Sequence, residues 1–114
     1  MSPTPAPAAF DAPTPVQLAN FGDQLEEQRR FRLDQLEELR AIDPHNTSEV
    51  TEVLAAGART ALHDVLAALH RIDAGTYGIC TDCGSRLPIE RLEILPQVGQ
   101  CLPCRRGADV RSGR

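Results

Sequence analysis

The chain contains no tryptophan, no lysine and only four aromatic residues among its 114. A chain of this size buries a modest fraction of its surface, and so few large side chains predict a thin core. A staple such as a bound metal is therefore an expected source of stability. Because lysine is absent, every positively charged side chain other than histidine is an arginine.

Long apolar runs and targeting signals are also missing. No stretch approaches the roughly 18 apolar residues that a membrane helix needs, so we expect no membrane partner. The N-terminal sequence MSPTPAPAAFDAPTP has neither a basic n-region nor a continuous apolar h-region, unlike a secretory signal. We therefore expect a cytoplasmic protein, in which clustered thiols are metal ligands or catalytic groups more often than disulfides.

Charge is distributed unevenly along the chain. Residues 16–74 hold six arginines against eleven acids, a formal balance of −5, whereas residues 75–114 hold six arginines against four acids, a balance of +2. The net charge of the whole chain is −4. Attraction to phosphates requires a basic surface, so direct DNA binding is not expected.

A first long helix is predicted from residue 15 onward. Thr14 can cap it, Pro15 suits the first helical position, and Gln17 can complete a capping box. The helix should stop before Pro44, because the residue preceding a proline avoids the α region. Arginines at positions 29 and 32 interrupt the expected apolar side, which consists of Leu18, Phe21, Leu25, Leu33, Leu36 and Leu39.

A second helix of similar length should follow at once, with Asn46, Thr47 or Ser48 as its cap and Gly75 as its stop. A short connection between two such helices predicts an antiparallel hairpin with arms about 40 Å long and coiled-coil packing. A compact bundle is the alternative, but the sequence offers no third long helix. The expected apolar side is Val50, Leu54, Ala58, Ala61, Leu62, Val65, Leu69 and Ile72.

Four cysteines form two Cys-x-x-Cys pairs, Cys80 with Cys83 and Cys101 with Cys104, separated by seventeen residues. Two disulfides, a thiol switch and a metal site are the alternatives. Zinc prefers four soft ligands in a tetrahedron, and each pair can supply two of them from one tight turn. Gly84 can provide the positive φ that such a turn needs. The spacing favours one structural Zn²⁺ with all four cysteines as ligands, and leaves no coordination position open for catalysis.

Catalytic patterns are not found elsewhere in the sequence. It shows no Ser-His-Asp order, no phosphate loop and no paired-carboxylate site, and the zinc-deaminase motif is absent. His63 and His70 are expected to be solvated helix residues, and His45 to be a turn residue. We therefore expect no enzymatic activity.

The predicted fold class is mainly α, with an antiparallel coiled-coil helical hairpin followed by a small four-cysteine zinc finger. Residues 1–13 hold four of the nine prolines and predict a disordered Pro/Ala-rich tail. Residues 14–74 form the hairpin, with its tip near residues 43–48. Residues 75–106 form the zinc finger, and residues 107–114 form a flexible tail containing arginine.

A recognisable signature lies in the stretch GTYGICTDCGSRLPIERLEILPQVGQCLPCRR, residues 75–106. It reads Tyr-Gly-x-Cys-x-x-Cys-Gly, then Arg-Leu-x-x-x-Pro and a second Cys-x-x-Cys, and it resembles the DksA/TraR family of zinc-finger proteins. The matching residues are Tyr77, Gly78, Cys80, Cys83, Gly84, Leu87, Pro88, Arg91, Leu92, Pro96, Cys101 and Cys104.

The resemblance implies a bacterial transcription regulator whose partner is RNA polymerase rather than DNA. Family members insert the coiled-coil tip into the secondary channel, where acidic tip residues act near the catalytic magnesium. Their zinc-bearing end rests at the rim of the channel. Some members respond jointly with the alarmone ppGpp, and such coupling is left open for this chain. An acidic rod would be attracted to a basic channel.

The tip differs from that of the well-studied members, which carry Asp-x-x-Asp-x-Ala. In the nearest frame, residues 43–48, Asp43 matches the first acid, and Asn46 and Ser48 occupy the other two motif positions. Glu49 and Glu52 supply two acids further along. We expect a partner-binding tip of Asp43, Asn46, Glu49 and Glu52, with Asp43 leading. A plain turn is the alternative reading of Asp43.

Two other classes of function stay open. Six arginines in residues 75–114 could make a small nucleic-acid-binding module, although the finger has one aromatic residue and no recognition helix of the His-containing type. The hairpin could also be the docking surface of a plain adaptor that does not act through the channel.

Overall fold

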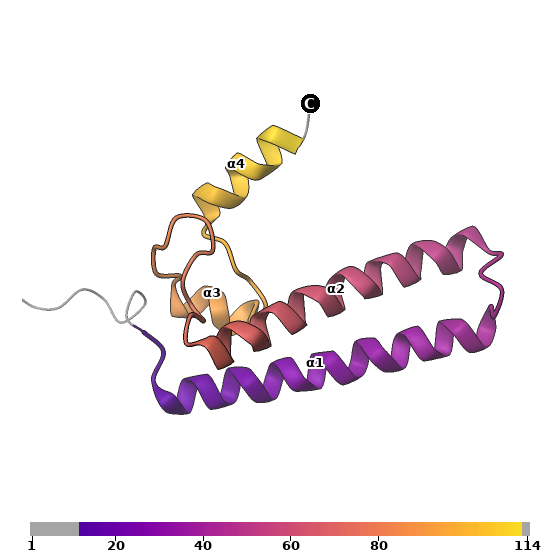
Figure 1. Ribbon diagram of the computed structural model, residues 1–114, viewed down its shortest axis with the longest axis horizontal. Helices are drawn as coiled ribbons and strands as arrows, with labels where there is room; N and C mark the ends of the chain where they lie inside the picture. Colours follow the sequence, from indigo (N-terminus) through magenta and orange to yellow (C-terminus); the bar gives the residue numbers. More distant parts are fainter. Residues whose placement is uncertain (1–11, 113–114) are drawn as a thin grey trace, which may run out of the picture.

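The computed structural model describes residues 12–112, so the tail predicted for residues 1–13 lies almost wholly outside the described part. The described residues form four helices: α1 (Pro15–Ile42), α2 (Glu49–Ala74), α3 (Ile89–Ile94) and α4 (Leu102–Ser112). The described residues form no strand, only an isolated antiparallel bridge between Ile79 and Arg86. Figure 1 shows a long hairpin of α1 and α2 with the finger at its base. The predicted fold class is confirmed.

The first helix begins and ends where local chemistry predicts. The Thr14 hydroxyl accepts a hydrogen bond from the Gln17 backbone N–H at 3.1 Å. The Thr14 backbone N–H donates in return to Gln17 Oε1 at 2.8 Å, which completes a capping box. Pro15 occupies the first turn, where a missing N–H costs nothing. The helix ends at Ile42, directly before the Asp43-Pro44 pair.

The second helix runs back beside the first (Figure 1). Ser48 is its cap and accepts from the Thr51 N–H at 3.3 Å. Gly75 ends it in the left-handed conformation, with φ at 79°, and its N–H bonds to carbonyls of the last turn. With 28 and 26 residues, the arms are about 40 Å long. Despite this length, no helix within residues 12–112 is apolar enough to span a membrane.

One hydrophobic core joins the base of the hairpin to the finger. The rings of Phe21 and Tyr77 lie with centroids 5.5 Å apart across this junction. Leu25 is fully buried between the two parts. The complete set of buried residues in this core is Phe21, Leu25, Val65, Ala68, Tyr77, Cys80, Leu87 and Leu92. Because both parts contribute to it, the finger and the base of the hairpin share one source of stability.

The distal half of the hairpin packs differently from the sequence expectation. Leu33, placed in the apolar side by prediction, is 43% exposed. A spacing of three and four residues from buried Leu25 instead passes through Arg29 and Arg32, both half-buried, before it reaches Leu36. Long arginine stems can line such a seam while their charged ends reach solvent. The arginines that interrupt the predicted stripe therefore lie in line with the buried residues of α1 and are themselves half-buried.

The predicted apolar side of α2 needs a similar correction. Val50 and Leu54 are 69% and 48% exposed, and Ala55, which was not predicted, is buried. The rest of the predicted side, from Ala58 to Ile72, is buried or half-buried as expected. Small alanines let the two helices approach closely, and the larger side chains point away from α1. The prediction is wrong only at the tip-proximal end of α2, where it placed Val50 and Leu54, rather than Ala55, on the side that faces α1.

The chain after the second cysteine pair also differs from prediction. Residues 107–114 were expected to form a flexible tail, but α4 continues to Ser112. The helix begins with Leu102 and Pro103, and proline is favoured in the first turn of a helix. The domain boundaries themselves stay a prediction.

Candidate metal centre and hairpin tip

The first cysteine pair sits in a tight turn closed by backbone hydrogen bonds. The Gly84 N–H donates to the Cys80 carbonyl at 3.0 Å, and the Cys80 N–H donates to the Ser85 carbonyl at 2.8 Å. Gly84 has φ at 78°, a conformation that side chains other than glycine rarely adopt. Gly84 is therefore present because the turn that positions Cys80 and Cys83 requires its backbone conformation.

The second pair is presented by the start of α4. Cys101 directly precedes α4, and Cys104 lies in its first turn. Two hydrogen bonds join this loop to the first one: the Thr81 N–H donates to the Gly99 carbonyl at 2.8 Å, and Gln100 Nε2 donates to Asp82 Oδ2 at 2.6 Å. These bonds hold the two pairs face to face.

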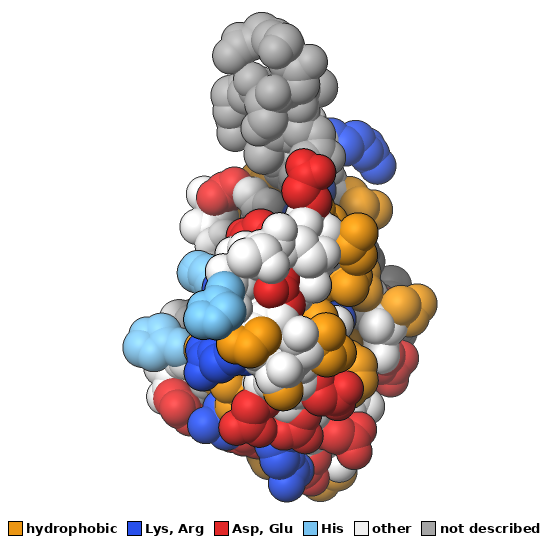
Figure 2. All heavy atoms as spheres, turned by 90° about the vertical axis from the view of Figure 1, so that its right-hand side faces the viewer, with side chains coloured by type: hydrophobic (Ala, Val, Ile, Leu, Met, Phe, Trp, Pro, Cys, Tyr) orange, Lys and Arg blue, Asp and Glu red, His pale blue; other side chains and the backbone are white. Residues whose placement is uncertain are grey.

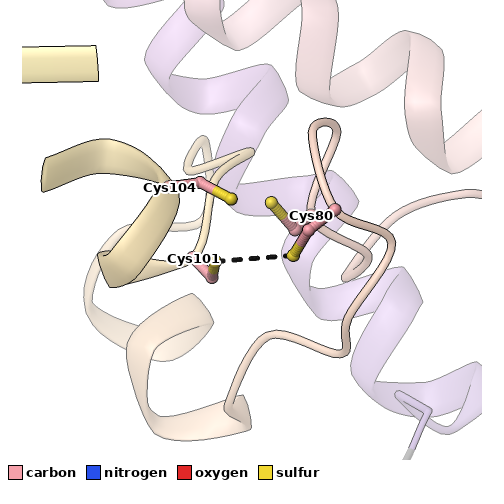
Figure 3. A group of neighbouring side chains, drawn as sticks. Cys80, Cys101 and Cys104 are labelled. Atoms are coloured by element: carbon pink, nitrogen blue, oxygen red, sulfur yellow. Dashed lines mark hydrogen bonds between the residues drawn. The ribbon is translucent and has the colours of Figure 1, made fainter. Parts of the chain in front are cut away.

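The four sulfur atoms come together in one cluster. All Sγ atoms of Cys80, Cys83, Cys101 and Cys104 lie within 4.8 Å of one another, and the Cys83–Cys101 separation is 3.7 Å. None of the four is in a disulfide. Figure 3 shows the sulfurs of Cys80, Cys101 and Cys104 pointing toward one another. Tetrahedral zinc with Zn–S bonds of about 2.3 Å separates its sulfurs by about 3.8 Å, so the cluster fits this ion.

The electrostatics of the cluster favour a bound cation. Burial acts to raise the pKa of the Cys80 thiol, but hydrogen bonds from backbone N–H groups of Cys101, Cys83 and Asp82 outweigh it and lower the pKa to about 6. Side-chain hydrogen bonds with Cys101, Cys83 and Cys80 raise the pKa of Cys104. Four sulfurs this close resist becoming four thiolates on their own, and a divalent cation removes that resistance.

Polar contacts close the finger and join it to the hairpin. The buried Tyr77 hydroxyl donates to the Pro96 carbonyl at 2.7 Å, and burial raises the pKa of this hydroxyl. Arg71 of α2 donates to the carbonyls of Gln97 and Val98 at 3.3 and 3.4 Å. Neither role was predicted from the sequence, although Tyr77 belongs to the recognised signature. The Tyr77 hydrogen bond holds two segments of the finger together, and the Arg71 contacts join the finger to α2.

At the tip, the carboxylate of Asp43 is engaged in the turn itself. Its Oδ1 accepts from the Thr47 N–H at 3.0 Å and from the Thr47 hydroxyl at 3.1 Å, while Oδ2 accepts from the Ser48 N–H at 2.9 Å. These backbone hydrogen bonds from Ser48 and Thr47 lower the pKa of Asp43. Asp43 therefore closes the connection between α1 and α2.

The other polar residues predicted for the tip also differ in their contacts. Asn46 adopts a left-handed φ of 53°, and its Nδ2 donates to Glu52 Oε1 at 2.6 Å. Glu52 also pairs with Arg59 at 3.0 Å. Glu49 is exposed, and within residues 12–112 its carboxylate makes no hydrogen bond or ion pair. Of the three predicted tip acids, Glu49 alone is available to a partner without breaking an internal contact.

The described histidines stay apart from the cysteine cluster. His45, His63 and His70 are all exposed, and none belongs to the group of side chains that could hold a metal. Their positions agree with solvated turn and helix residues.

Fold and site together define a protein with a helical hairpin mounted on a four-thiol metal centre. Residues 75–109 match the family described as the prokaryotic dksA/traR C4-type zinc finger. The chain therefore carries a dksA/traR C4-type zinc finger next to its hairpin. The family match and the clustering of the four thiols confirm the prediction of one zinc site.

Curated relatives match beyond the finger. The chain is 39% identical over 74 residues to the uncharacterized protein YteA of Bacillus subtilis strain 168, an alignment that covers 58% of this chain and 31% of YteA. It is 34% identical over 67 residues to an uncharacterized protein of Aquifex aeolicus strain VF5, covering 59% and 46%. The matched part is thus less than half of the length of either relative.

A solved structure has a similar fold over most of the chain. The structure of the RNA polymerase binding protein and transcriptional regulator Dks from Chlamydia trachomatis L2 aligns with a TM-score of 0.57. The alignment covers 84% of this chain and 91% of that one at 22% identity. At this identity the comparison establishes a common fold.

Proposed function

We propose that the protein regulates transcription by binding RNA polymerase, with its hairpin inserted tip first into the secondary channel. The observation that carries the proposal is the projecting hairpin, whose arms of 28 and 26 residues end in a compact, capped turn far from the metal centre. The shared fold with a protein described as an RNA polymerase binding regulator supports it.

Charge supports the same partner. The segment 16–74 has a formal balance of −5, and such a rod is attracted to a channel with basic walls. The arms are too long and narrow for a compact bundle, and within residues 12–112 the distal half packs only against its own partner arm. A part of this shape suits insertion into a narrow opening.

In this proposal zinc is structural. Cys80, Cys83, Cys101 and Cys104 would all bind it as thiolates, and the ion would supply folding energy to the finger rather than chemistry. Cys80 is also a member of the shared core, so the ion would hold the base from which the hairpin projects.

The direct test is competition on purified bacterial RNA polymerase. The zinc-loaded protein should bind the polymerase and be displaced by another factor that enters the secondary channel. Binding should weaken as salt rises, because an acidic rod loses its attraction when charges are screened. Failure to bind, or binding without competition, would contradict the proposal.

A shortened hairpin tests the depth of insertion. Gly22 lies against Ile72 at the base, so in an antiparallel pair residues 33–39 lie opposite residues 55–61. Deleting both segments removes one heptad from each arm, about 10 Å, and keeps the turn of residues 43–48 and the register, although it also removes Gly57 and Arg59, the partner of Glu52. We expect this variant to keep its metal and its shared core but to lose its effect on transcription initiation in a purified system.

The same binding experiments test the alternative that the finger is a nucleic-acid-binding module. If the wild-type protein does not bind polymerase but binds random duplex DNA with a steep salt dependence, the finger is a nucleic-acid-binding module and the proposed insertion into the channel is wrong.

A further inference from the structure

An exposed apolar strip runs along the distal part of α2. Val50 and Val53 are 69% and 70% exposed, and Leu54 beside them is 48% exposed. Together with Glu49 they line a shallow open depression of about 250 Å³. We call Val50, Val53, Leu54 and Gly57 the α2 strip. Figure 2, which views the tip end, shows hydrophobic side chains gathered on one side and acidic side chains below, toward α1.

The α2 strip continues a surface that is already covered nearer the base. Steps of three and four residues lead from Val53 through Gly57 to Asp64, Ala67 and Arg71, so these residues share one side of the helix. The last three line a cleft against the finger, and Arg71 donates to finger carbonyls. One side of α2 thus serves as an interface at the base and is bare near the tip.

Gly57 gives an independent indication that something approaches this side closely. Glycine inside a helix costs roughly 1 kcal/mol relative to alanine. A Cβ added at Gly57 would meet no atom within 4 Å, and its backbone φ is not positive. Nothing inside the described molecule therefore requires glycine at this position of a 26-residue helix. The missing Cβ leaves room for a partner to approach the helix closely at this point.

Charge at the tip-proximal end of the α2 strip specifies the partner further. The Glu49 carboxylate is free, whereas those of Asp43 and Glu52 are engaged within the tip. A basic side chain that approached the strip would meet Glu49 without displacing another contact.

We propose that the α2 strip, with Glu49 at its end, is the surface of the hairpin that contacts the polymerase. Its occupant is an apolar segment of the polymerase that passes close to Gly57 and carries a basic side chain opposite Glu49. In this arrangement Asp43 shapes the tip rather than contacting the partner. The inference rests on the proposed function and deepens it, because it assigns the contact to one side of one helix.

The experiment measures binding of purified single variants to RNA polymerase. Val53→Ser should weaken binding about tenfold, since burying the side chain of one valine contributes roughly that much. Gly57→Ala should weaken it by at least as much, because a methyl group blocks close approach. Glu49→Gln should weaken it by a few fold and flatten its salt dependence. Each of these variants should nevertheless stay folded, because the substituted positions are exposed.

The chain offers matched controls. Val16→Ser changes a valine of equal exposure, 70%, at the opposite end of the hairpin. Gly22→Ala adds a methyl group to α1, where the Cβ would make an ordinary contact with Ile72 at 3.9 Å. Both glycine variants should raise the thermal midpoint, because alanine is the better helix former. Only Gly57→Ala should also weaken polymerase binding. The comparison therefore distinguishes a lost contact with the partner from an effect on folding.

Each outcome decides between the two claims. If wild type binds and all strip variants bind equally well, the inference is overturned and the proposed function stands. If wild type does not bind polymerase, both fall. If sedimentation shows a wild-type dimer that Val53→Ser and Gly57→Ala convert to monomer, the occupant is a second copy of this chain, and the assignment to polymerase is wrong.

Discussion

Replacing Leu25 with alanine tests the claim that one core holds both the hairpin and the finger together. Leu25 is fully buried at the junction, in the same cluster as Phe21, Tyr77 and the metal ligand Cys80. A leucine-to-alanine change at such a site costs about 2–5 kcal/mol, because the apolar contact is lost and a cavity remains. With a urea dependence of about 1.5 kcal/mol/M, a loss of about 3 kcal/mol moves the midpoint by about 2 M.

Leu33→Ala is the control on the same helix. Simple periodicity places both leucines in the seam, but Leu33 is 43% exposed. Its replacement should cost less than about 1 kcal/mol, as at most exposed positions.

The assay follows two signals in one urea titration of the zinc-loaded protein. Helix content is read by circular dichroism, and metal release by a chromogenic chelator. Leu25→Ala should lower both midpoints together, because Cys80 loses its support when the shared core opens. Two results would refute the shared core. One is an equal shift of the midpoints in Leu25→Ala and Leu33→Ala. The other is a Leu25→Ala variant whose helix midpoint falls while its zinc-release midpoint stays at the wild-type urea concentration.

Three further predictions follow from the site and the tip. Cys83→Ser should abolish stoichiometric zinc binding in elemental analysis, because a structural site needs its four thiolates, while much of the hairpin helix signal should remain; a variant that retains one zinc would contradict this. Tyr77→Phe should cost about 1–3 kcal/mol in the same urea titration, because the buried Pro96 carbonyl loses its donor. The pKa of Asp43 is depressed below its ordinary 3.8, so its stabilisation of the tip should be complete above that pH and lost as the pH falls through the lower folded value. Amide resonances of Thr47 and Ser48 should report this loss, and Asp43→Asn should remove it.

Helix ends were predictable because their causes are local. The Thr14 capping box, the Ser48 cap and the Gly75 stop each depend on atoms within a few residues. The metal cluster was predictable for a related reason, since each Cys-x-x-Cys turn positions two thiols through its own backbone and the separation of the pairs suits one tetrahedral ion.

The distal part of the hairpin seam was not predictable from side-chain character. Periodicity favoured large residues such as Leu33 and Leu54, but the surfaces in contact are set by the α1–α2 geometry, which leaves both exposed and buries Ala55. The shared core was missed because it joins Phe21 to Tyr77, which are far apart in sequence. Helical periodicity contains no information on such contacts.

The role of the Asp43 carboxylate could not be predicted from the sequence either. Its place at the end of α1 allowed either a partner-binding acid or a turn residue, and only the directions of its two oxygens separate these readings. Both oxygens face the backbone of residues 47 and 48. The structure therefore favours the turn, and moves attention to Glu49 as the accessible acid.

The two ends of the hairpin depend on different interactions, so a change that destabilises the base need not alter the surface that the tip presents to a partner. At the base, Cys80 belongs both to the thiol cluster and to the apolar core, so loss of zinc should be transmitted to the packing of Phe21 and Leu25. At the tip, the hydrogen bonds of Asp43 and the Asn46–Glu52–Arg59 chain involve no atom of the finger. Removing the metal should then leave a capped tip on an unsupported arm. The finger would thus determine where the tip is presented, whereas the tip's own contacts determine its shape. Metal removal should weaken polymerase binding by releasing the support of the hairpin. Substitutions in the α2 strip should weaken it by removing direct contacts.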